Sequence, residues 1–255
     1  MRTFLLAVLL TGFSVQAVGC AGTQGGAATS RQDAGTYYDR GVELYGKGDL
    51  AGAIAEYRTA LRLDPNFVAA HFNLGNALVE KGDREGAIAE FRTVLRLDPK
   101  SPAAHYNLGN SLAEKGDVEG AIAEYRTALR LDPNFMLAHY NLGHALLKNG
   151  DVEGAIAEFR TALRLAPNFE LAHYYLGNAL QKNGDVEGAI AEYRTALRLA
   201  PNFPAAHYNL GIELQQLGRK AEAREEFTAV QRLVPNTPAN QQKIEQVRQR
   251  LRELE

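Results

Sequence analysis

Residues 102–135, PAAHYNLGNSLAEKGDVEGAIAEYRTALRLDPNF, are the stretch that decides the fold. Apolar and small side chains recur in them at steps of three and four residues, once before and once after a Gly-Asp pair. That spacing is typical of two amphipathic helices in succession. We expect Gly116 to end the first helix in a left-handed conformation, Asp117 to cap the second, and Pro133 to stop it. The stretch therefore predicts a helix–turn–helix unit.

The same unit recurs with a period of 34 residues. Glycine marks one position of the period, at Gly41, Gly75, Gly109, Gly143, Gly177 and Gly211. Proline marks another, at Pro65, Pro99, Pro133, Pro167, Pro201 and Pro235. A fixed period of this length indicates a solenoid, because one helix pair cannot bury its apolar stripe alone and has to stack on its neighbours.

These units resemble tetratricopeptide repeats, in which Gly, Ala, an aromatic residue and Pro stand at fixed places. In the third unit those places hold Gly109, Ala121, Tyr125 and Pro133. The resemblance implies an all-α fold, a right-handed superhelical solenoid of six helix-turn-helix repeats with a C-terminal capping helix. The expected repeats span 34–67, 68–101, 102–135, 136–169, 170–203 and 204–237. The capping helix is expected within 238–255, where the apolar stripe consists of Ile244, Val247, Leu251 and Leu254.

Five of the six histidines share one position of the period, where the family often has tryptophan: His71, His105, His139, His173 and His207. Neighbouring repeats stack about 10 Å apart, as packed helices do. Metal ligands lie about 2 Å from one shared ion. Successive histidines therefore cannot share a metal, and we expect them to serve packing. We expect no metal and no cofactor.

Catalytic motifs are missing or incomplete. The segment GVELYGK, Gly41–Lys47, matches most of a phosphate-binding loop, but Gly48 replaces its Ser or Thr and no strand precedes it. We therefore expect a protein that is not an enzyme and has no small-molecule substrate. Two arginines recur in the second helix of each repeat, but acidic residues lie beside them and the net charge of the chain is −2. This balance favours a solvated face over nucleic-acid binding, which stays the less favoured alternative.

The resemblance also implies a concave groove, because first-helix residues of the family face inward and hold a peptide. The matching residues are Tyr38, Phe72, Asn73, Asn76, Tyr106, Asn107, Asn110, Tyr140, Asn141, His144, Lys148, Tyr174, Asn178, Lys182, Tyr208 and Asn209. Aromatic rings offer rigid apolar contact and asparagines can bind peptide amides. The alternative is that these residues are merely tolerated on a groove wall. Along the groove edge Glu80 and Glu114 precede Lys148 and Lys182, which predicts that a partner binds in one direction.

The N-terminus has the pattern of a signal peptide, with Arg2 followed by the apolar run 4–10. Residues 17–20, Ala-Val-Gly-Cys, resemble the lipobox of bacterial lipoproteins, which implies cleavage after residue 19 and acylation of Cys20. By the same resemblance, Ala21 favours the outer membrane, on its periplasmic side. The alternative is an ordinary signal peptide and a soluble periplasmic or secreted protein. Residues 20–33 are rich in Gly, Ala and Thr and are expected to form a flexible tether.

Together these features predict a scaffold at the bacterial cell envelope that binds a protein or peptide in its groove. One alternative is an assembly chaperone for an envelope or pilus machine, because lipoproteins of pilus biogenesis with six such repeats have a similar layout. The identity of the partner does not follow from the sequence.

Overall fold

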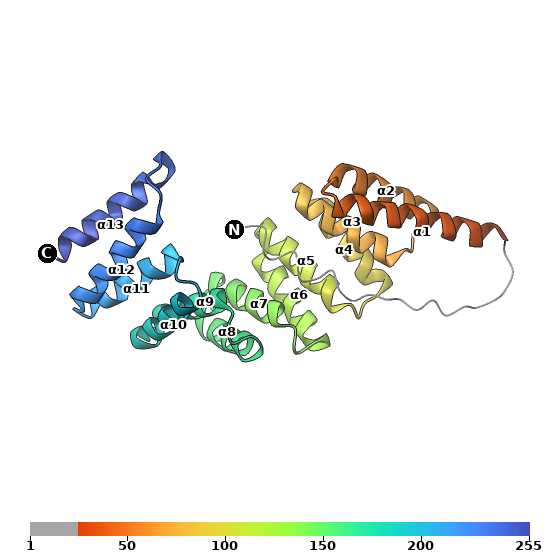
Figure 1. Ribbon diagram of the computed structural model, residues 1–255. Coiled ribbons are helices and arrows are strands. Elements are labelled where there is room, and N and C mark those ends of the chain that lie inside the picture. Colours follow the sequence, from red (N-terminus) through yellow and green to blue (C-terminus); the bar gives the residue numbers. More distant parts are fainter. Residues whose placement is uncertain (1–24) are drawn as a thin grey trace.

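The structure is a computed structural model that describes residues 25–255 (Figure 1). Within this range the chain forms thirteen α-helices and one short 3-10 helix, and it forms no strand there. Consecutive helices pack as pairs, and the pairs stack side by side into an elongated, curved array (Figure 1). The predicted all-α solenoid is confirmed. The signal peptide and Cys20 lie outside the described residues.

Each repeat contributes a first and a second helix. The first helices are α1 (Gly25–Gly46), α3 (Val68–Lys81), α5 (Pro102–Lys115), α7 (Met136–Lys148), α9 (Glu170–Lys182) and α11 (Pro204–Gln216). The second helices are α2 (Leu50–Leu63), α4 (Arg84–Leu97), α6 (Val118–Leu131), α8 (Val152–Leu165), α10 (Val186–Leu199) and α12 (Lys220–Leu233). A 3-10 turn, η1 (Pro238–Asn240), leads to α13 (Gln241–Glu253), which packs on α12 as the expected cap.

Helix α1 begins earlier than the sequence suggested. It starts at Gly25, so residues 25–33 of the expected tether are helical. The composition permits this, because Ala, Gln and Arg are good helix formers that can extend a helix already held by packing further along. That packing begins at Ala34, whose side chain is 1% exposed.

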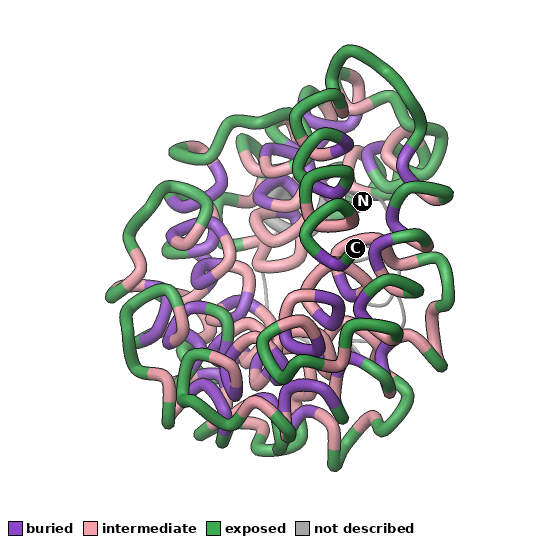
Figure 2. Tube along the Cα trace, turned by 90° about the vertical axis from the view of Figure 1, so that its left-hand side faces the viewer, coloured by how far each residue is buried: buried purple, intermediate pink, exposed green. Residues whose placement is uncertain are grey.

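The core of every repeat rests on a close contact between a glycine and an aromatic ring. A Cβ atom at Gly109 would lie 2.7 Å from the Tyr125 ring, so only glycine lets α5 and α6 approach this closely. Tyr125 is 2% exposed as a result. Figure 2 shows such buried positions on the sides of the helices that face their neighbours, with exposed residues around the outside.

Aspartates start the second helices of repeats 1–5. The Asp117 carboxylate accepts a hydrogen bond of 2.9 Å from the Gly120 amide. A Cβ at Gly120 would lie 2.5 Å from the same carboxylate, so glycine leaves room for the cap. Glycine costs about 1 kcal/mol of helix propensity, and the cap offsets it with about 1 kcal/mol.

The periodic histidines join helices. His139 Nδ1 lies 2.6 Å from Glu158 Oε2 on α8, and its Nε2 lies 3.0 Å from the Pro133 carbonyl oxygen before α7. The same two contacts recur at His71, His105, His173 and His207. Both partners are hydrogen-bond acceptors, so each imidazole joins two segments of its repeat through its two ring nitrogens. We call this arrangement the histidine staple.

The pKa of the histidine is raised at two of the staples. The hydrogen bond to Glu226 raises the pKa of His207, in spite of partial burial. Burial alone would lower the pKa of His71, but the bonds to Glu90 and to the Pro65 carbonyl outweigh it and the pKa rises. No group of three or more His, Cys, Asp or Glu side chains within residues 25–255 is arranged to hold a metal ion.

Candidate functional site

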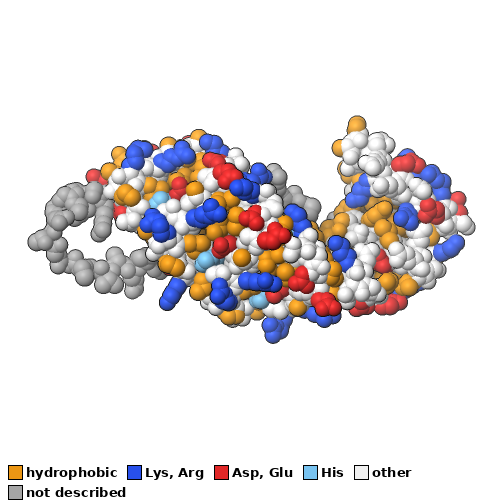
Figure 3. All heavy atoms as spheres, turned by 180° about the vertical axis from the view of Figure 1, so that it is seen from behind, with side chains coloured by type: hydrophobic (Ala, Val, Ile, Leu, Met, Phe, Trp, Pro, Cys, Tyr) orange, Lys and Arg blue, Asp and Glu red, His pale blue; other side chains and the backbone are white. Residues whose placement is uncertain are grey.

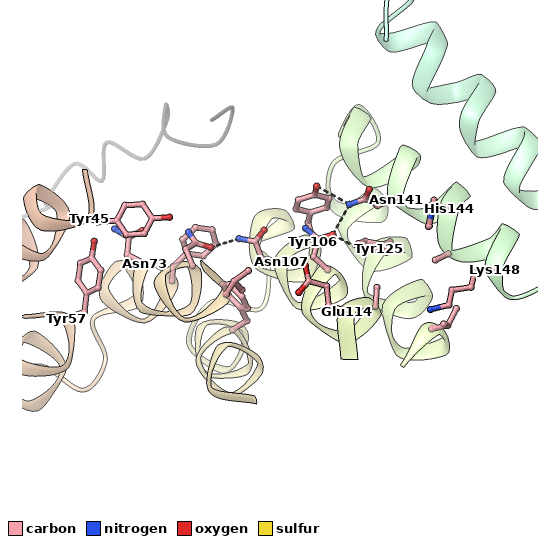
Figure 4. A pocket seen from close by; sticks show the side chains of 18 of the residues that line it. Tyr45, Tyr57, Asn73, Tyr106, Asn107, Glu114, Tyr125, Asn141, His144 and Lys148 are labelled. Atoms are coloured by element: carbon pink, nitrogen blue, oxygen red, sulfur yellow. Dashed lines mark hydrogen bonds between the residues drawn. The ribbon is translucent and has the colours of Figure 1, made fainter. Parts of the chain in front are cut away.

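A pocket of about 670 Å³ opens along the first helices of repeats 1–4 (Figure 4). Its volume lies in the range of ligand-binding pockets. Apolar contact comes from Val42, Tyr45 and Val79, and polar contact comes from the asparagines of α3, α5 and α7. The second helices contribute buried rings such as Tyr125 beneath these side chains. The pocket therefore offers both apolar surface and amide groups.

The structure brings many of the predicted groove residues together here. Those that line the pocket are Phe72, Asn73, Asn76, Tyr106, Asn107, Asn110, Asn141, His144 and Lys148. The others lie on the same helix positions but outside this pocket: Tyr38, Tyr140, Tyr174, Asn178, Lys182, Tyr208 and Asn209. Their role in binding stays a prediction.

The groove tyrosines are deeper than the sequence suggested. Tyr106 and Tyr140 are only 3% and 6% exposed. The Tyr106 ring packs 4.8 Å from Phe135, which the turn before α7 places over it, and 6.0 Å from Tyr125. Burial accordingly raises the pKa of Tyr106. These rings form the floor of the groove, and a partner would meet mainly the side chains around them.

The asparagines are hydrogen-bonded from repeat to repeat. The Asn107 amide donates to Asn76 Oδ1 at 3.0 Å, and the Asn141 amide donates to Asn110 Oδ1 at 2.7 Å. The amide of Asn209, on α11, donates to Asn178 Oδ1, on α9, at 2.8 Å. We call these three contacts the asparagine ladder. It follows the groove and fixes the spacing of the first helices.

The ladder leaves donors available. Asn110 Oδ1 accepts both from Asn141 and from the Tyr125 hydroxyl, at 2.7 Å each. The amide nitrogen of Asn76 donates to no acceptor among the described residues, whereas Asn110 also hydrogen-bonds the Tyr106 side chain. An amide held in place by its oxygen with its N–H groups unpaired is suited to the carbonyl oxygens of an extended peptide. The predicted use of asparagines is chemically consistent with this geometry.

The charged side chains on the groove edge differ in whether they have a bonding partner. Glu80 accepts a hydrogen bond from the Tyr45 hydroxyl, and Glu114 accepts one of 3.2 Å from Arg84 Nε. Lys148 and Lys182 are exposed and pair with no acidic side chain in the described part of the chain. The edge of repeats 4 and 5 therefore carries positive charge with no acidic partner, whereas Glu114 of repeat 3 is paired with Arg84.

Sequence reasoning missed some of the apolar lining. Val42, Tyr45, Val79 and Ala113 line the pocket, although only Tyr45 is aromatic and none repeats a fixed residue type. The available signal was that Tyr45, Val79 and Ala113 share one period position, which is apolar in repeats 1–4 and is glutamine in repeats 5 and 6. Such variation is typical of a surface that contacts a ligand. The residue types alone do not distinguish a ligand-contacting position from a packing position.

Two protein-family models match the amino-acid sequence of the chain. A model described as "TPR repeat" matches residues 41–82, 75–116 and 109–150, and one described as "Tetratricopeptide repeat" matches 140–204 and 174–238. The chain belongs to the tetratricopeptide-repeat family. Its members are in general non-enzymatic scaffolds for protein interaction, and the matches indicate no catalytic family. No curated protein sequence matches the chain significantly.

Solved structures of tetratricopeptide-repeat proteins resemble the chain. MamA is 28% identical, with a TM-score of 0.63 over 66% of this chain and 92% of MamA. YrrB, described as having an unusual peptide-binding site, is 23% identical, with a TM-score of 0.62 over 71% of this chain and 93% of YrrB. PilW, a type IV pilus biogenesis factor, is 20% identical, with a TM-score of 0.72 over 85% of this chain and 98% of PilW. The last two likenesses concern the fold alone.

Proposed function

We propose that this tetratricopeptide-repeat protein binds an extended segment of a partner protein in the groove along α1, α3, α5 and α7. The supporting observation is the pocket of about 670 Å³, which combines apolar lining with asparagines of α3, α5 and α7. Among them, the Asn76 amide N–H groups have no acceptor in the described part of the chain. Apolar contact supplies most of the free energy of such binding, and amides fix the backbone of the bound segment.

Site-specific photocrosslinking tests this proposal. A photoreactive residue at Asn76 or Asn110 should crosslink to a bound partner, because both side chains line the pocket. The matched control is the same residue at Arg92, which is exposed on the second helix α4. Partner yield that is equal at Arg92 and in the groove would contradict binding in the groove.

We also propose that the protein is held at the cell envelope through an acylated Cys20. The support is the lipobox-like sequence at 17–20 and its place after an apolar run. Among residues 25–255 no helix is both long and apolar enough to cross a bilayer. Changing Cys20 to Ser should move the protein from the membrane fraction to the soluble periplasmic fraction. Unchanged membrane association would refute the lipid anchor.

Assembly of an envelope or pilus machine is a second candidate function. The likeness to PilW covers 98% of that chain, so the two solenoids have nearly the same extent, although the likeness concerns the fold alone. Deletion of the gene should then abolish surface pili in a piliated host. A strain that assembles pili normally without the protein would exclude this role.

A further inference from the structure

The asparagine ladder is missing between repeats 1 and 2, where Val42 stands opposite Asn73, and it is interrupted once more further along the groove. Between repeats 2 and 3, 3 and 4, and 5 and 6, an asparagine on one first helix donates to an asparagine on the previous one. Between repeats 4 and 5 the two equivalent positions hold His144 and Tyr175. Both asparagines of one contact have been replaced together, in repeats that are otherwise nearly identical to their neighbours.

The two replacing side chains contact each other. Their ring centroids lie 4.9 Å apart, and the rings meet edge to face at 81°. Tyr175 also lies 5.9 Å from Tyr140 and 5.1 Å from Tyr174. Below it, the Phe159 ring is nearly parallel at 6.2 Å and belongs to the core. The polar contact of the other repeat boundaries has therefore become an aromatic cluster.

Part of this cluster is open to solvent. His144 is exposed, and Tyr174 and Tyr175 are half-buried, whereas Tyr140 is covered. Desolvation lowers the pKa of His144, and the positive charge of Lys148 lowers it further, which favours the neutral imidazole. A neutral imidazole beside a half-buried tyrosine offers apolar and aromatic surface, and it lies at the end of the pocket.

The charge at one end of the cluster is positive. Lys148 lies one turn after His144 on α7, and Lys182 holds the equivalent position on α9. Both are exposed and unpaired within the described range, whereas Glu80 and Glu114 at the same position of repeats 2 and 3 are hydrogen-bonded. The acidic Glu170 begins α9 and lies at the opposite end of that helix from Lys182. The end of the cluster next to the lysines is therefore complementary to carboxylates. Figure 3 gives the wider context, with basic and acidic side chains interspersed over the visible face.

From these observations we infer that the aromatic cluster of repeats 4 and 5, with Lys148 and Lys182, is the specificity site of the groove. It takes an aromatic side chain of a partner protein that is flanked by aspartate or glutamate. The aromatic residue packs against His144 and Tyr175, and the carboxylates meet the two ammonium groups. This inference rests on the proposed groove function and names the chemistry of the partner segment.

The chain itself supplies the decisive variant. His144→Asn with Tyr175→Asn introduces the residues present at the three regular contacts, so a contact already found in this chain replaces the aromatic pair and the fold should be retained. The probe is a short fluorescein-labelled Gly/Ser peptide that carries one phenylalanine flanked by glutamates. Fluorescence anisotropy with the full chain should give about tenfold weaker binding for the double variant, the size typical of losing a central aromatic contact. Circular dichroism confirms that the variant is folded.

Three comparisons complete the test. Lys148→Gln with Lys182→Gln should weaken binding and reduce its salt dependence, because exposed charge pairs are screened. The same peptide with lysines for glutamates, or with alanine for phenylalanine, should bind at least about tenfold more weakly. The control Arg92→Ser changes an exposed residue of α4 that does not line the pocket, and it should leave affinity for the probe unchanged. Equal affinity of the wild type and the His144/Tyr175 double variant, or equal binding of the lysine peptide, would overturn the inference.

Failure of the inference can be distinguished from failure of the groove function. Selection of a random displayed peptide library on the full chain reports any peptide that the groove accepts. The selected peptides could lack acidic and aromatic residues and still bind more weakly when groove residues are substituted. That result would leave the groove function standing and refute the specificity site. If no library peptide and no probe binds, both proposals fail.

Discussion

The inner repeats and the two end repeats differ in how they satisfy buried polar groups. Among the described residues, two buried side-chain oxygens lack a hydrogen-bond partner, Glu56 Oε2 in repeat 1 and Glu213 Oε2 in repeat 6. In repeat 2, by contrast, the equivalent oxygen of Glu90 accepts from His71 Nδ1 at 2.5 Å. Repeat 1 has Tyr37 at the histidine position, so its staple is absent.

Repeat 6 deviates at another position. Glu213 is 0% exposed and stands where repeats 4 and 5 have Ala145 and Ala179. One of its oxygens accepts from the Gln181 amide of repeat 5, and the other has no partner. The comparison teaches that a shared period does not give equal stability, because an unpaired buried oxygen costs about 1–3 kcal/mol.

The largest expected effect comes from breaking an inner repeat. Phe159→Ala should lower the free energy of unfolding by about 3–5 kcal/mol, because it removes a fully buried ring and leaves a cavity in its place. Tyr57→Ala makes a similar cavity in repeat 1, but that end can unfold locally without separating the other repeats. Urea denaturation followed by circular dichroism should show the larger loss for Phe159→Ala. Equal losses would contradict a distinction between inner and end repeats.

Removing the buried carboxylate of repeat 6 should be next in size. Glu213→Ala should stabilise the protein at neutral pH by about 1–3 kcal/mol, because it removes an unpaired buried oxygen. Burial raises the pKa of Glu213 above its ordinary value of 4.5, so the folded state binds its proton more tightly. Stability due to this group therefore falls as the pH rises from 4.5 through the raised pKa. Thermal unfolding of the variant should lack that fall. The conservative Glu213→Gln keeps the size and controls for the cavity.

The stabilisation by the histidine staple of repeat 6 should depend on pH in the opposite direction from that of an ordinary paired carboxylate. The pKa of His207 is raised by Glu226, so its stabilisation is present below the ordinary value of 6.5 and is lost as the pH rises through the folded pKa. His207→Gln should cost about 1–2 kcal/mol at low pH and less at high pH. Urea midpoints measured across this range check the prediction. A cost that does not depend on pH would show that the bond works with neutral histidine.

The smallest expected effect is a repair of repeat 1. Tyr37→His introduces the residue of the other five repeats opposite Glu56, whose Oε2 lacks a donor. The new staple should stabilise repeat 1 by about 1 kcal/mol, the size of one added hydrogen bond. Hydrogen exchange of α1 and α2 amides should slow in the variant. Tyr37→Phe, which adds no donor, is the control and should leave exchange unchanged.

Much of the fold follows from the sequence, because the features that set it are local and repeated. Gly109 and its equivalents set the contact between the two helices of each repeat, and Pro133 and its equivalents mark the end of the second helix. The structure places these residues accordingly. The start of α1 was missed, since helix extension beyond the packed region leaves no apolar period. The pocket lies along the first helices, but Tyr106 forms its floor, because the covering ring of Phe135 comes from a turn and not from the same helix. The use of this pocket for binding stays a prediction.

The sequence by itself determined the repeat, its two helices, its caps and the face that each helix turns to its neighbours. Those properties depend on residues within one period, so reading the chain once is sufficient. Only the tertiary structure decided which side chains meet across repeats: the histidine with glutamate, asparagine with asparagine, and His144 with Tyr175. These partners lie 19 or 31 residues apart in the chain, and their contact depends on how the helices stack.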